Sequence, residues 1–357
     1  MHSARFYFLI FAVLVVLPVA VGTRRGFARA RRRAGVPADR NPGPEGGYQA
    51  ISWALRHLPA WLMRLATRVG TAVGYWTLPG QRAHSHEYLR LVLGREPTHR
   101  EGIAHFRAYA EFLLLRLQIC DGREPRLRFA DGQGDELRAL IASGQPALYG
   151  TMHVGRSDLV GFFLGDFGGH VHMIRKQVGN SQDTEGLARR YARSVTFIWI
   201  NDWSRLILAM NDALRAGHSL AMQCDRPEYS SKLEGFRFLG ARRMFPFTIY
   251  HLAIMHALPV VFSYAVPDEA DPEVTVVHVL PAYRPRAEVT RQENFAAARA
   301  HFQTVLDTVE AQLRRTPYLW FNYTPMNPPC DAAEHAAAGT QRARRTVRAL
   351  GGMRPAA

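Results

Sequence analysis

Short apolar runs alternate with helical stretches between residues 123 and 285, and this alternation constrains the fold more than any other feature of the chain. The apolar runs read ALYGTM, VHMI, VTFIWI, SLAMQC, PVVFSYAV and VTVVHVL, and the helical candidates among them span 157–165, 182–193, 203–216 and 245–257. Short strands separated by helices are typical of a sheet with helices on its faces. The sequence therefore predicts an α/β fold for this part of the chain.

The segments on either side of this region are predicted to be helical. Apolar residues recur at helical spacing through 49–120. Thr98 is placed to cap a helix that begins THREGIAHF. Residues 292–315 read as a further long helix, which ends before Pro317.

The amino-terminal segment predicts a membrane anchor. Residues 6–22 carry no charge, and these 17 residues are near the shortest length that spans a bilayer as a helix. The basic cluster follows this run, at 24–33, rather than preceding it. This order favours an uncleaved anchor over 1–23, with the rest of the chain on the cytoplasmic side. A cleaved signal peptide and a buried hairpin remain open as alternatives.

Two other segments are predicted to lie outside the packed domain. Residues 24–47 form a basic flank and a linker that is rich in Pro and Gly. Residues 331–357 are rich in Ala and Arg without apolar periodicity, which predicts a disordered basic tail. The domain between them is expected to have a helical part at 48–120 and an α/β part at 123–325.

The charge and the cysteine content limit the classes of function. The formal net charge is +15, and only Lys176 and Lys232 of its 45 cations are lysines. This balance predicts either an anionic ligand, such as nucleic acid, lipid headgroups or a phosphorylated substrate, or simple arginine bias with basic tails. The three cysteines are far apart and have no CxxC spacing, so neither a zinc knuckle nor a disulfide framework is suggested, and a reducing compartment is expected.

One strand-to-helix turn carries a candidate catalytic pair. His153 follows the strand candidate ending at Met152, at the side of an open α/β sheet where sites are built. Asp158 follows five residues later, and a carboxylate beside an imidazole is what a general base needs. Gly155 gives the turn the freedom to bring the two together, and Ser157 is placed to cap the next helix.

Other interpretations of this turn remain open. His153 taken alone is most often a structural histidine at the end of a strand. Ser157 as a nucleophile would want the pattern G-x-S-x-G, which lacks its second glycine here. His170 and His172 point to one face of a strand, but no HExxH motif or cysteine set accompanies them as a metal site would require. We therefore expect no metal.

The blocks that follow the HVGRSD turn carry a family resemblance. They are VTFIWINDWSR at 195–205, SLAMQCDRPE at 219–228 and HALPVVFSYAV at 256–266. Together with that turn, in order and spacing, they resemble the four blocks of the HxxxxD glycerolipid acyltransferase superfamily. The stretch with Asp225, Phe238, Gly240 and Pro259, and the closing segment TPYLWFNYTP at 316–325, resemble the lipid A late acyltransferases, the lauroyl/myristoyl transferase family.

This resemblance covers roughly 48–325 and implies a fold, a reaction and a location. The fold is a mixed sheet flanked by helices, preceded by a transmembrane helix and a helical segment. The reaction moves a fatty acyl group from an acyl-carrier-protein or acyl-CoA thioester to a hydroxyl of a glycolipid, a lipid A-type precursor. No metal or bound cofactor is implied. The implied location is the bacterial inner membrane, with a single span and the catalytic domain on the cytoplasmic side.

The resemblance also implies roles for individual residues. His153 takes the hydroxyl proton, and Asp158 orients His153. Asp225 organises the pocket through an arginine. The candidates for binding a phosphate group or lining the pocket are Arg205 first, then Arg175, Arg156, Arg226 and Arg237.

This chain departs from the family pattern inside the catalytic turn. Arg156 and Ser157 stand where the family usually has Asn-Trp, and Asp158 stands where this branch more often has Glu. Asn322 and Tyr323 replace basic residues of the closing segment. These departures leave other acceptors open, namely a lysophospholipid, an aminolipid or another glycolipid. A non-catalytic membrane- or nucleic-acid-binding protein is the alternative from another class.

Overall fold

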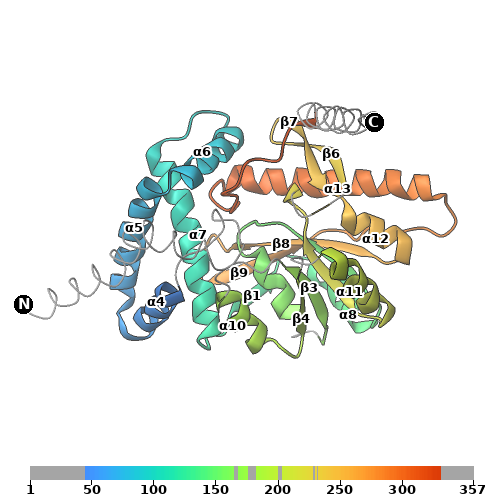
Figure 1. Cartoon of the computed structure of the whole chain (residues 1–357), viewed down its shortest axis with the longest axis horizontal. Coiled ribbons are helices and arrows are strands. Elements are labelled where there is room, and N and C mark those ends of the chain that lie inside the picture. The colour runs from blue at the N-terminus through green and yellow to red at the C-terminus, as the bar shows by residue number, and fades with distance from the viewer. Residues whose placement is uncertain are drawn as a thin grey trace, which may run out of the picture.

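The computed structural model describes residues 45–164, 168–175, 182–199, 203–227, 230 and 232–330 (Figure 1). The predicted anchor at 1–23 and the predicted tail at 331–357 lie outside the described residues, as does the predicted linker up to residue 44. Within the described ranges, no helix combines the length and the apolar character needed to cross a membrane.

The helices predicted over 49–120 are present. They are α4 (Glu45–His57), α5 (Ala60–Thr77), α6 (Pro79–Leu93) and α7 (His99–Cys120). The cap predicted at Thr98 is also present, since the Thr98 side chain accepts from the Glu101 amide and the Glu101 carboxylate accepts from the Thr98 amide. α5 and α6 pack on α7, which lies against the α/β part (Figure 1).

The α/β part contains a seven-stranded mixed sheet. Its strands are β1 (Arg126–Phe129), β2 (Leu148–Thr151), β3 (Val171–Arg175), β4 (Val195–Trp199), β5 (Ser219–Gln223), β8 (Val260–Pro267) and β9 (Val274–Val279). The strand order is β1-β9-β8-β2-β5-β3-β4, and the β8–β9 pair is antiparallel while the other pairs are parallel. The predicted fold class, an α/β mixed sheet flanked by helices, is confirmed for the described residues.

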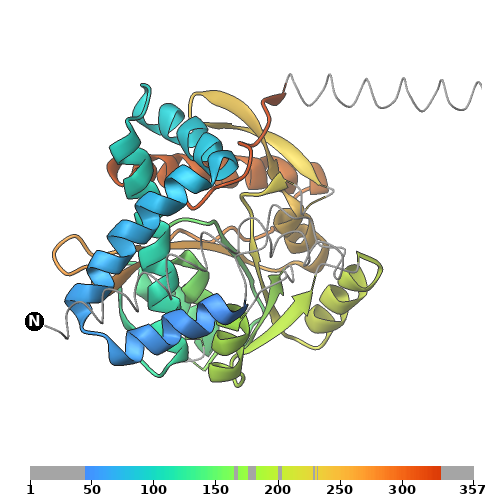
Figure 2. The ribbon, with the colours of Figure 1, turned by 60° about the vertical axis from the view of Figure 1, so that its left-hand side comes forward.

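Each face of the sheet has its own apolar core, because alternate strand residues point to opposite faces. Leu148 faces a core formed with α6, α11 (Trp203–Arg215), α12 (Thr248–His256) and α13 (Arg291–Arg315). Its neighbour Tyr149 faces a second core formed with α7, α8 (Gly134–Ala142), α9 (Val160–Phe163) and α10 (Gln182–Arg190). Figures 1 and 2 show these two helical layers on either side of the strands.

A small hairpin was not predicted from the sequence. It joins β6 (Leu233–Phe238) to β7 (Ala241–Pro246), and β6 packs on α13. Its two turn residues, Leu239 and Gly240, both have positive φ angles, 48° and 78°. This turn geometry matches the twist of a hairpin but normally selects Asn-Gly or Asp-Gly. Here the first turn residue is Leu239, which is buried. The sequence therefore lacks the Asn-Gly or Asp-Gly signal that would predict this turn.

Candidate active site

The register of two neighbouring strands places His153 beside Asp225. Thr151 ends β2 and pairs with Gln223, which ends β5. His153 and Asp225 each lie two residues beyond this pair, at the carboxyl edge of parallel strands. Nδ1 of His153 is 2.8 Å from Oδ1 of Asp225, and the His153 amide donates to Oδ2 at 2.9 Å. The two residues therefore form a hydrogen-bonded imidazole–carboxylate pair.

The closing segment of the chain holds this pair from the other side. The indole Nε1 of Trp320 donates to Oδ2 of Asp225 at 2.9 Å, and the Asn327 amide donates to the Asp225 carbonyl at 3.0 Å. The Phe321 amide donates to the His153 carbonyl at 2.9 Å. Asp225 is 1% exposed and Trp320 2%, so both carboxylate oxygens are satisfied away from water.

This hydrogen bonding determines which nitrogen of His153 can react. An ionised carboxylate only accepts, so Nδ1 carries the proton and Nε2 is left with its lone pair. The His153 side chain is 21% exposed, in contrast to its partner. Nε2 can therefore take a proton from a hydroxyl group that reaches this edge of the sheet.

The electrostatics keep His153 neutral and Asp225 ionised at neutral pH. Burial and the charge of Arg226 lower the pKa of His153, against the opposite effect of Asp225. Burial acts to raise the pKa of Asp225, but His153, Arg226 and the Trp320 hydrogen bond outweigh it and hold that pKa well below its usual range. A neutral imidazole beside a permanent carboxylate is the state that a general base requires.

Asp158 does not orient His153, and this prediction is wrong. Its carboxylate forms ion pairs with Arg175 and Arg116, and the Gln223 amide donates to it at 3.2 Å. Burial acts to raise the pKa of Asp158, but the two arginines dominate and lower it well below its usual range. Arg175 was predicted to bind a phosphate group. Its guanidinium instead pairs with Asp158, with Nη1 3.0 Å from Oδ2.

Arg156 and Ser157 also differ from their predicted roles. The Arg156 guanidinium turns to the β8–β9 connection, where it donates to Thr275 Oγ1 at 2.9 Å and to the Pro272 carbonyl at 2.7 Å. It ties the turn to β9 rather than lining an acceptor site. The Ser157 hydroxyl donates to the Val154 carbonyl and accepts from the Ala265 amide, so it neither caps a helix nor is exposed as a nucleophile.

Gly155 has the freedom that the sequence predicts for it. Its φ is +54°, and a Cβ there would lie 2.4 Å from the Ala265 carbonyl oxygen. A side chain at this position would therefore collide with β8 as well as strain the backbone. Its amide donates to the Leu319 carbonyl at 2.6 Å, which joins the turn to the closing segment.

The remaining predicted arginines differ in their placement. Arg226 follows Asp225 directly in the chain and donates to the Phe321 carbonyl at 3.2 Å. Arg205 lies in α11, but its side chain is outside what the structure describes. Arg237 is exposed on β6, where its backbone pairs with the Gln303 side chain of α13.

The residues described contain no group of three or more His, Cys, Asp or Glu side chains that could hold a metal ion. His172 and His218 do meet, with Nε2 of the first 2.9 Å from Nδ1 of the second. They lie at the amino ends of β3 and β5, the opposite edge of the sheet from His153.

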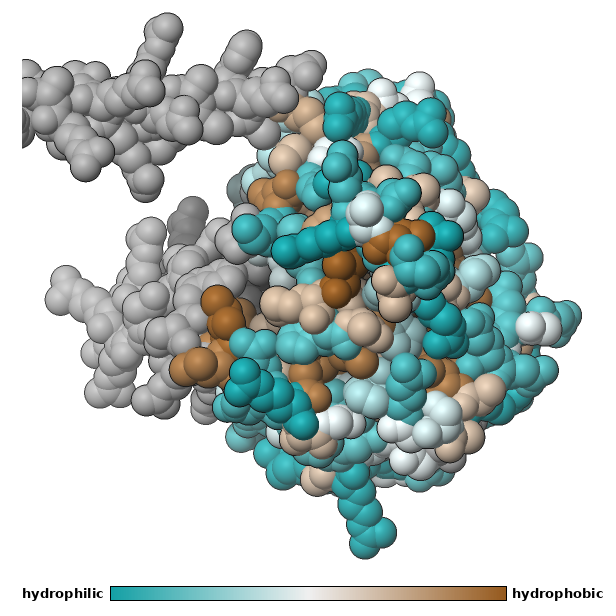
Figure 3. Space-filling model, turned by 90° about the vertical axis from the view of Figure 1, so that its right-hand side faces the viewer, coloured by the Kyte–Doolittle hydropathy of each residue, from teal (hydrophilic) through white to brown (hydrophobic). Residues whose placement is uncertain are grey.

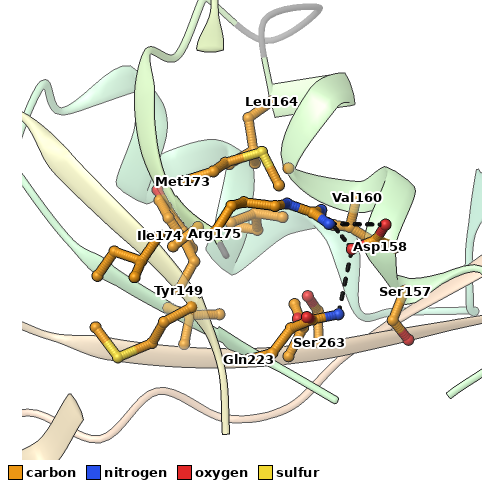
Figure 4. Close-up of a pocket in the computed structure, with 16 residues that line it drawn as sticks. Tyr149, Ser157, Asp158, Val160, Leu164, Met173, Ile174, Arg175, Gln223 and Ser263 are labelled. Atoms are coloured by element: carbon orange, nitrogen blue, oxygen red, sulfur yellow. Dashed lines mark hydrogen bonds and ion pairs between the residues drawn. The ribbon is translucent and has the colours of Figure 1, made fainter. Parts of the chain in front are cut away.

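A pocket lies beside the Asp158 ion pairs, between the sheet and α9 (Figure 4). The pocket is small and partly open to solvent. Thr151 and Ser157, on either side of His153 in the chain, both line it. Its wall is mainly apolar, with Tyr149, Val160, Leu164, Met173 and Ile174 around it.

Comparison with known proteins does not show which family the chain belongs to. No protein-family model matches it, and neither does any curated protein. Among solved structures, the chain is similar to the crystal structure of the 1-acyl-sn-glycerophosphate (LPA) acyltransferase, PlsC, from Thermotoga maritima. The identity is 12%, the match covers 71% of this chain and 97% of that chain, and the TM-score is 0.34. Similarity at this level is too low to support a conclusion about function.

Two features of the site could not be found by reading along the chain. Asp225 and His153 are 72 residues apart, and Trp320 and Asp225 are 95 apart. Each was noticed only as part of a separate motif. The strand order and register are what bring them together, and neither can be read from apolar periodicity alone.

Proposed function

We propose that the chain is a membrane-anchored O-acyltransferase of the glycerolipid acyltransferase superfamily, closest in kind to the lipid A late acyltransferases. It would move a fatty acyl group from an acyl-carrier-protein or acyl-CoA thioester to a hydroxyl of a glycolipid at the cytoplasmic face of the bacterial inner membrane. The observation that carries this proposal is the His153–Asp225 pair, with Nε2 left to act as the base. The motif order in the sequence supports the same reaction class.

In this mechanism Nε2 of His153 takes the proton of the acceptor hydroxyl while the hydroxyl oxygen attacks the thioester carbonyl carbon. The imidazolium that forms is stabilised by Asp225, which already binds its other nitrogen. The tetrahedral intermediate then collapses with loss of the thiolate. His153 returns the proton to the thiolate sulfur, which leaves an ester, a free thiol and a neutral imidazole.

Arg226 is our candidate for stabilising negative charge at this site, because it directly follows Asp225 in the chain and donates to the carbonyl of Phe321, the residue whose amide binds His153. A cation there would favour the oxyanion of the intermediate or an anionic group of a substrate. We also propose that Arg205 binds a phosphate group, and this rests only on the order of the motifs in the sequence.

The pocket next to the catalytic turn is our candidate for part of the acyl chain. Its wall is mainly apolar, and residues flanking His153 line it. A chain that enters there would leave its thioester carbonyl close to the edge of the sheet where His153 lies. Proximity of the two reacting groups would then contribute to the rate together with base catalysis.

The test is acyl transfer by purified protein in lipid vesicles, with His153→Ala compared to His172→Ala. Loss of the base should lower the rate by about 10²- to 10⁴-fold without changing the circular-dichroism spectrum. His172 is a matched control, because its ring is also hydrogen-bonded to another side chain but lies at the opposite edge of the sheet. Full activity in His153→Ala would refute the mechanism.

The acceptor needs a separate experiment. Lipid mass spectrometry of a deletion strain should show loss of an acylated glycolipid and accumulation of the same lipid lacking one acyl group. Loss of an acylated phospholipid or aminolipid would instead assign the alternative acceptors. An unchanged lipid profile would count against the enzyme class.

A further inference from the structure

One face of α5 is apolar although it is exposed at the surface of the molecule. Trp61, Leu65, Val69 and Trp76 are 60%, 41%, 39% and 55% exposed, although they are large apolar residues. At 100° per residue these four positions fall within an arc of about 80° on the helix. They form a continuous exposed row, which we call the α5 stripe.

The α5 stripe cannot be the face that holds the helix in the fold. That role belongs to Leu62, Ala66 and Tyr75, which are buried among the neighbouring helices. α5 is thus apolar on its inner and its outer side, a pattern expected of a helix that is covered on both sides. Figure 2 turns the end of the molecule that carries α4 and α5 toward the viewer.

In the described ranges, the other large apolar residues that are exposed are spread over α4, α7, α11 and α12. Ile207 and Leu208 of α11 are each 63% exposed, and Met255 of α12 is 59% exposed. On the side of the molecule shown in Figure 3, apolar surface occurs as small groups among polar residues. Scattered apolar residues of this kind are normal for a soluble surface, whereas a contiguous row marks a site of interaction.

We propose that the α5 stripe, together with Trp53 of α4, lies on the surface of an anionic lipid bilayer. Trp53 is 42% exposed on the helix that packs beside α5. Tryptophan is the residue that lipid–water interfaces favour most, because its ring is apolar and its N–H is polar. Three of the six tryptophans of the chain are thus exposed on these two neighbouring helices.

The charge of α5 is complementary to an anionic bilayer surface. The helix has no Asp or Glu, and its cations Arg64 and Arg68 are exposed along one border of the stripe. Arg82 of α6 adds a guanidinium 5.3 Å from the Trp76 ring. Apolar residues bordered by arginines are typical of helices that lie in the plane of an anionic membrane surface. The docking does not depend on the proposed chemistry at His153.

Tryptophan fluorescence tests this docking in the full chain. All six tryptophans lie between 53 and 320, so the predicted anchor contributes no signal. The protein is reconstituted into vesicles of phosphatidylcholine and phosphatidylglycerol, with or without bromine on the acyl chains. Bromine quenches only those indoles that reach the acyl region, so anchoring by residues 1–23 alone gives no quenching.

We expect brominated lipid to quench the emission, and Trp61→Phe/Trp76→Phe to lose most of that quenching. Phenylalanine keeps the stripe apolar, so this variant removes the reporters rather than the docking. Trp199→Phe, on β4, should keep the quenching of the wild type. Equal quenching in the double variant and the wild type would overturn the proposal.

A second pair of variants removes the docking itself. Leu65→Glu/Val69→Glu should reduce the quenching of Trp53, Trp61 and Trp76. Ile207→Glu/Leu208→Glu, at more exposed positions on α11, should not reduce it. No quenching in the wild type overturns the proposal. If that absence comes with a dimer in detergent that Leu65→Glu/Val69→Glu dissociates, the stripe instead contacts a second copy of the chain.

Discussion

Asp225 and Asp158 are two buried aspartates at the same edge of one sheet, and they have opposite surroundings. The Asp225 carboxylate faces one imidazole, one indole N–H and one backbone N–H. Asp158 faces two guanidinium groups and an amide. A carboxylate held by neutral donors can stabilise a charge that appears on its imidazole during a reaction. A carboxylate already matched by two permanent cations is instead part of the structure.

The comparison teaches that spacing along the chain is a poor guide to partners at a strand end. Asp158 is five residues from His153 but points to Arg175 at the end of β3. Asp225 comes from another strand and meets His153 because β2 and β5 end in register. The HxxxxD pattern therefore finds the turn correctly but assigns the wrong carboxylate to the histidine.

Asp225→Asn should have the largest effect on catalysis. An amide keeps the shape but can donate to Nδ1, which favours the wrong tautomer, and it cannot balance the imidazolium. We expect kcat to fall by about 10³-fold, within the range known for general-base pairs. The measurement is the acyl-transfer rate in vesicles at several pH values, because raising the pH should not rescue a wrong tautomer. If kcat fell less in Asp225→Asn than in Asp158→Asn, Asp158 rather than Asp225 would be the catalytic carboxylate.

Asp158→Asn should act mainly on stability. It leaves Arg116 and Arg175 buried without their carboxylate, a change that costs about 3–5 kcal/mol of unfolding free energy. Denaturant unfolding measures this loss, and Arg175→Gln in the same background should restore part of it. The kcat of protein that remains folded should fall much less than in Asp225→Asn. A kcat near zero with unchanged stability would return Asp158 to the catalytic role.

The contrast also shows how much of the fold and of the site could be predicted from the sequence. Each of the six strands predicted from apolar runs is present, because strands buried on both faces read as continuous apolar segments. β1 was missed, since its four residues RLRF are half arginine and partly exposed. At the site, the sequence identified His153. The role of Asp225 depends on the register of β2 and β5, and the role of Trp320 depends on the closing segment returning to the catalytic turn. Arg116 gave no signal, because it looks like any surface arginine of an amphipathic helix.

Trp320→Phe should sharpen the Asp225 side of the comparison. It removes one hydrogen bond to a buried carboxylate, worth about 1.5–3 kcal/mol, while keeping the aromatic ring. If that loss falls on the transition state, kcat falls by about 10- to 100-fold. The lost bond normally lowers the pKa of Asp225, so Asp225 becomes more basic and holds the Nδ1 proton more firmly. The pKa of His153 then rises.

The acid limb of the pH–rate profile should therefore move to higher pH in Trp320→Phe, because a larger fraction of His153 is protonated at a given pH. A purely structural role for Trp320 would lower the rate without moving this limb. Trp199→Phe, a tryptophan on β4 that contacts Phe197, is the control for general effects of losing an indole.

Gly161→Leu should have the smallest effect, and it tests the pocket on the Asp158 side. A Cβ at Gly161 would lie 2.9 Å from Cε of Met173, a flexible side chain that lines the pocket. The added side chain and the displaced Met173 narrow the space. Each methylene of the acyl chain that loses burial costs about 0.8 kcal/mol, roughly fourfold in kcat/KM.

Longer thioesters should therefore lose activity while shorter ones keep it. The measurement is competition between thioesters of different length, with products separated by mass spectrometry. Gly80→Leu is the control, since a Cβ there meets open space. An equal loss at all lengths would mean that the acyl chain lies elsewhere, and the Asp158 region would then be structural throughout.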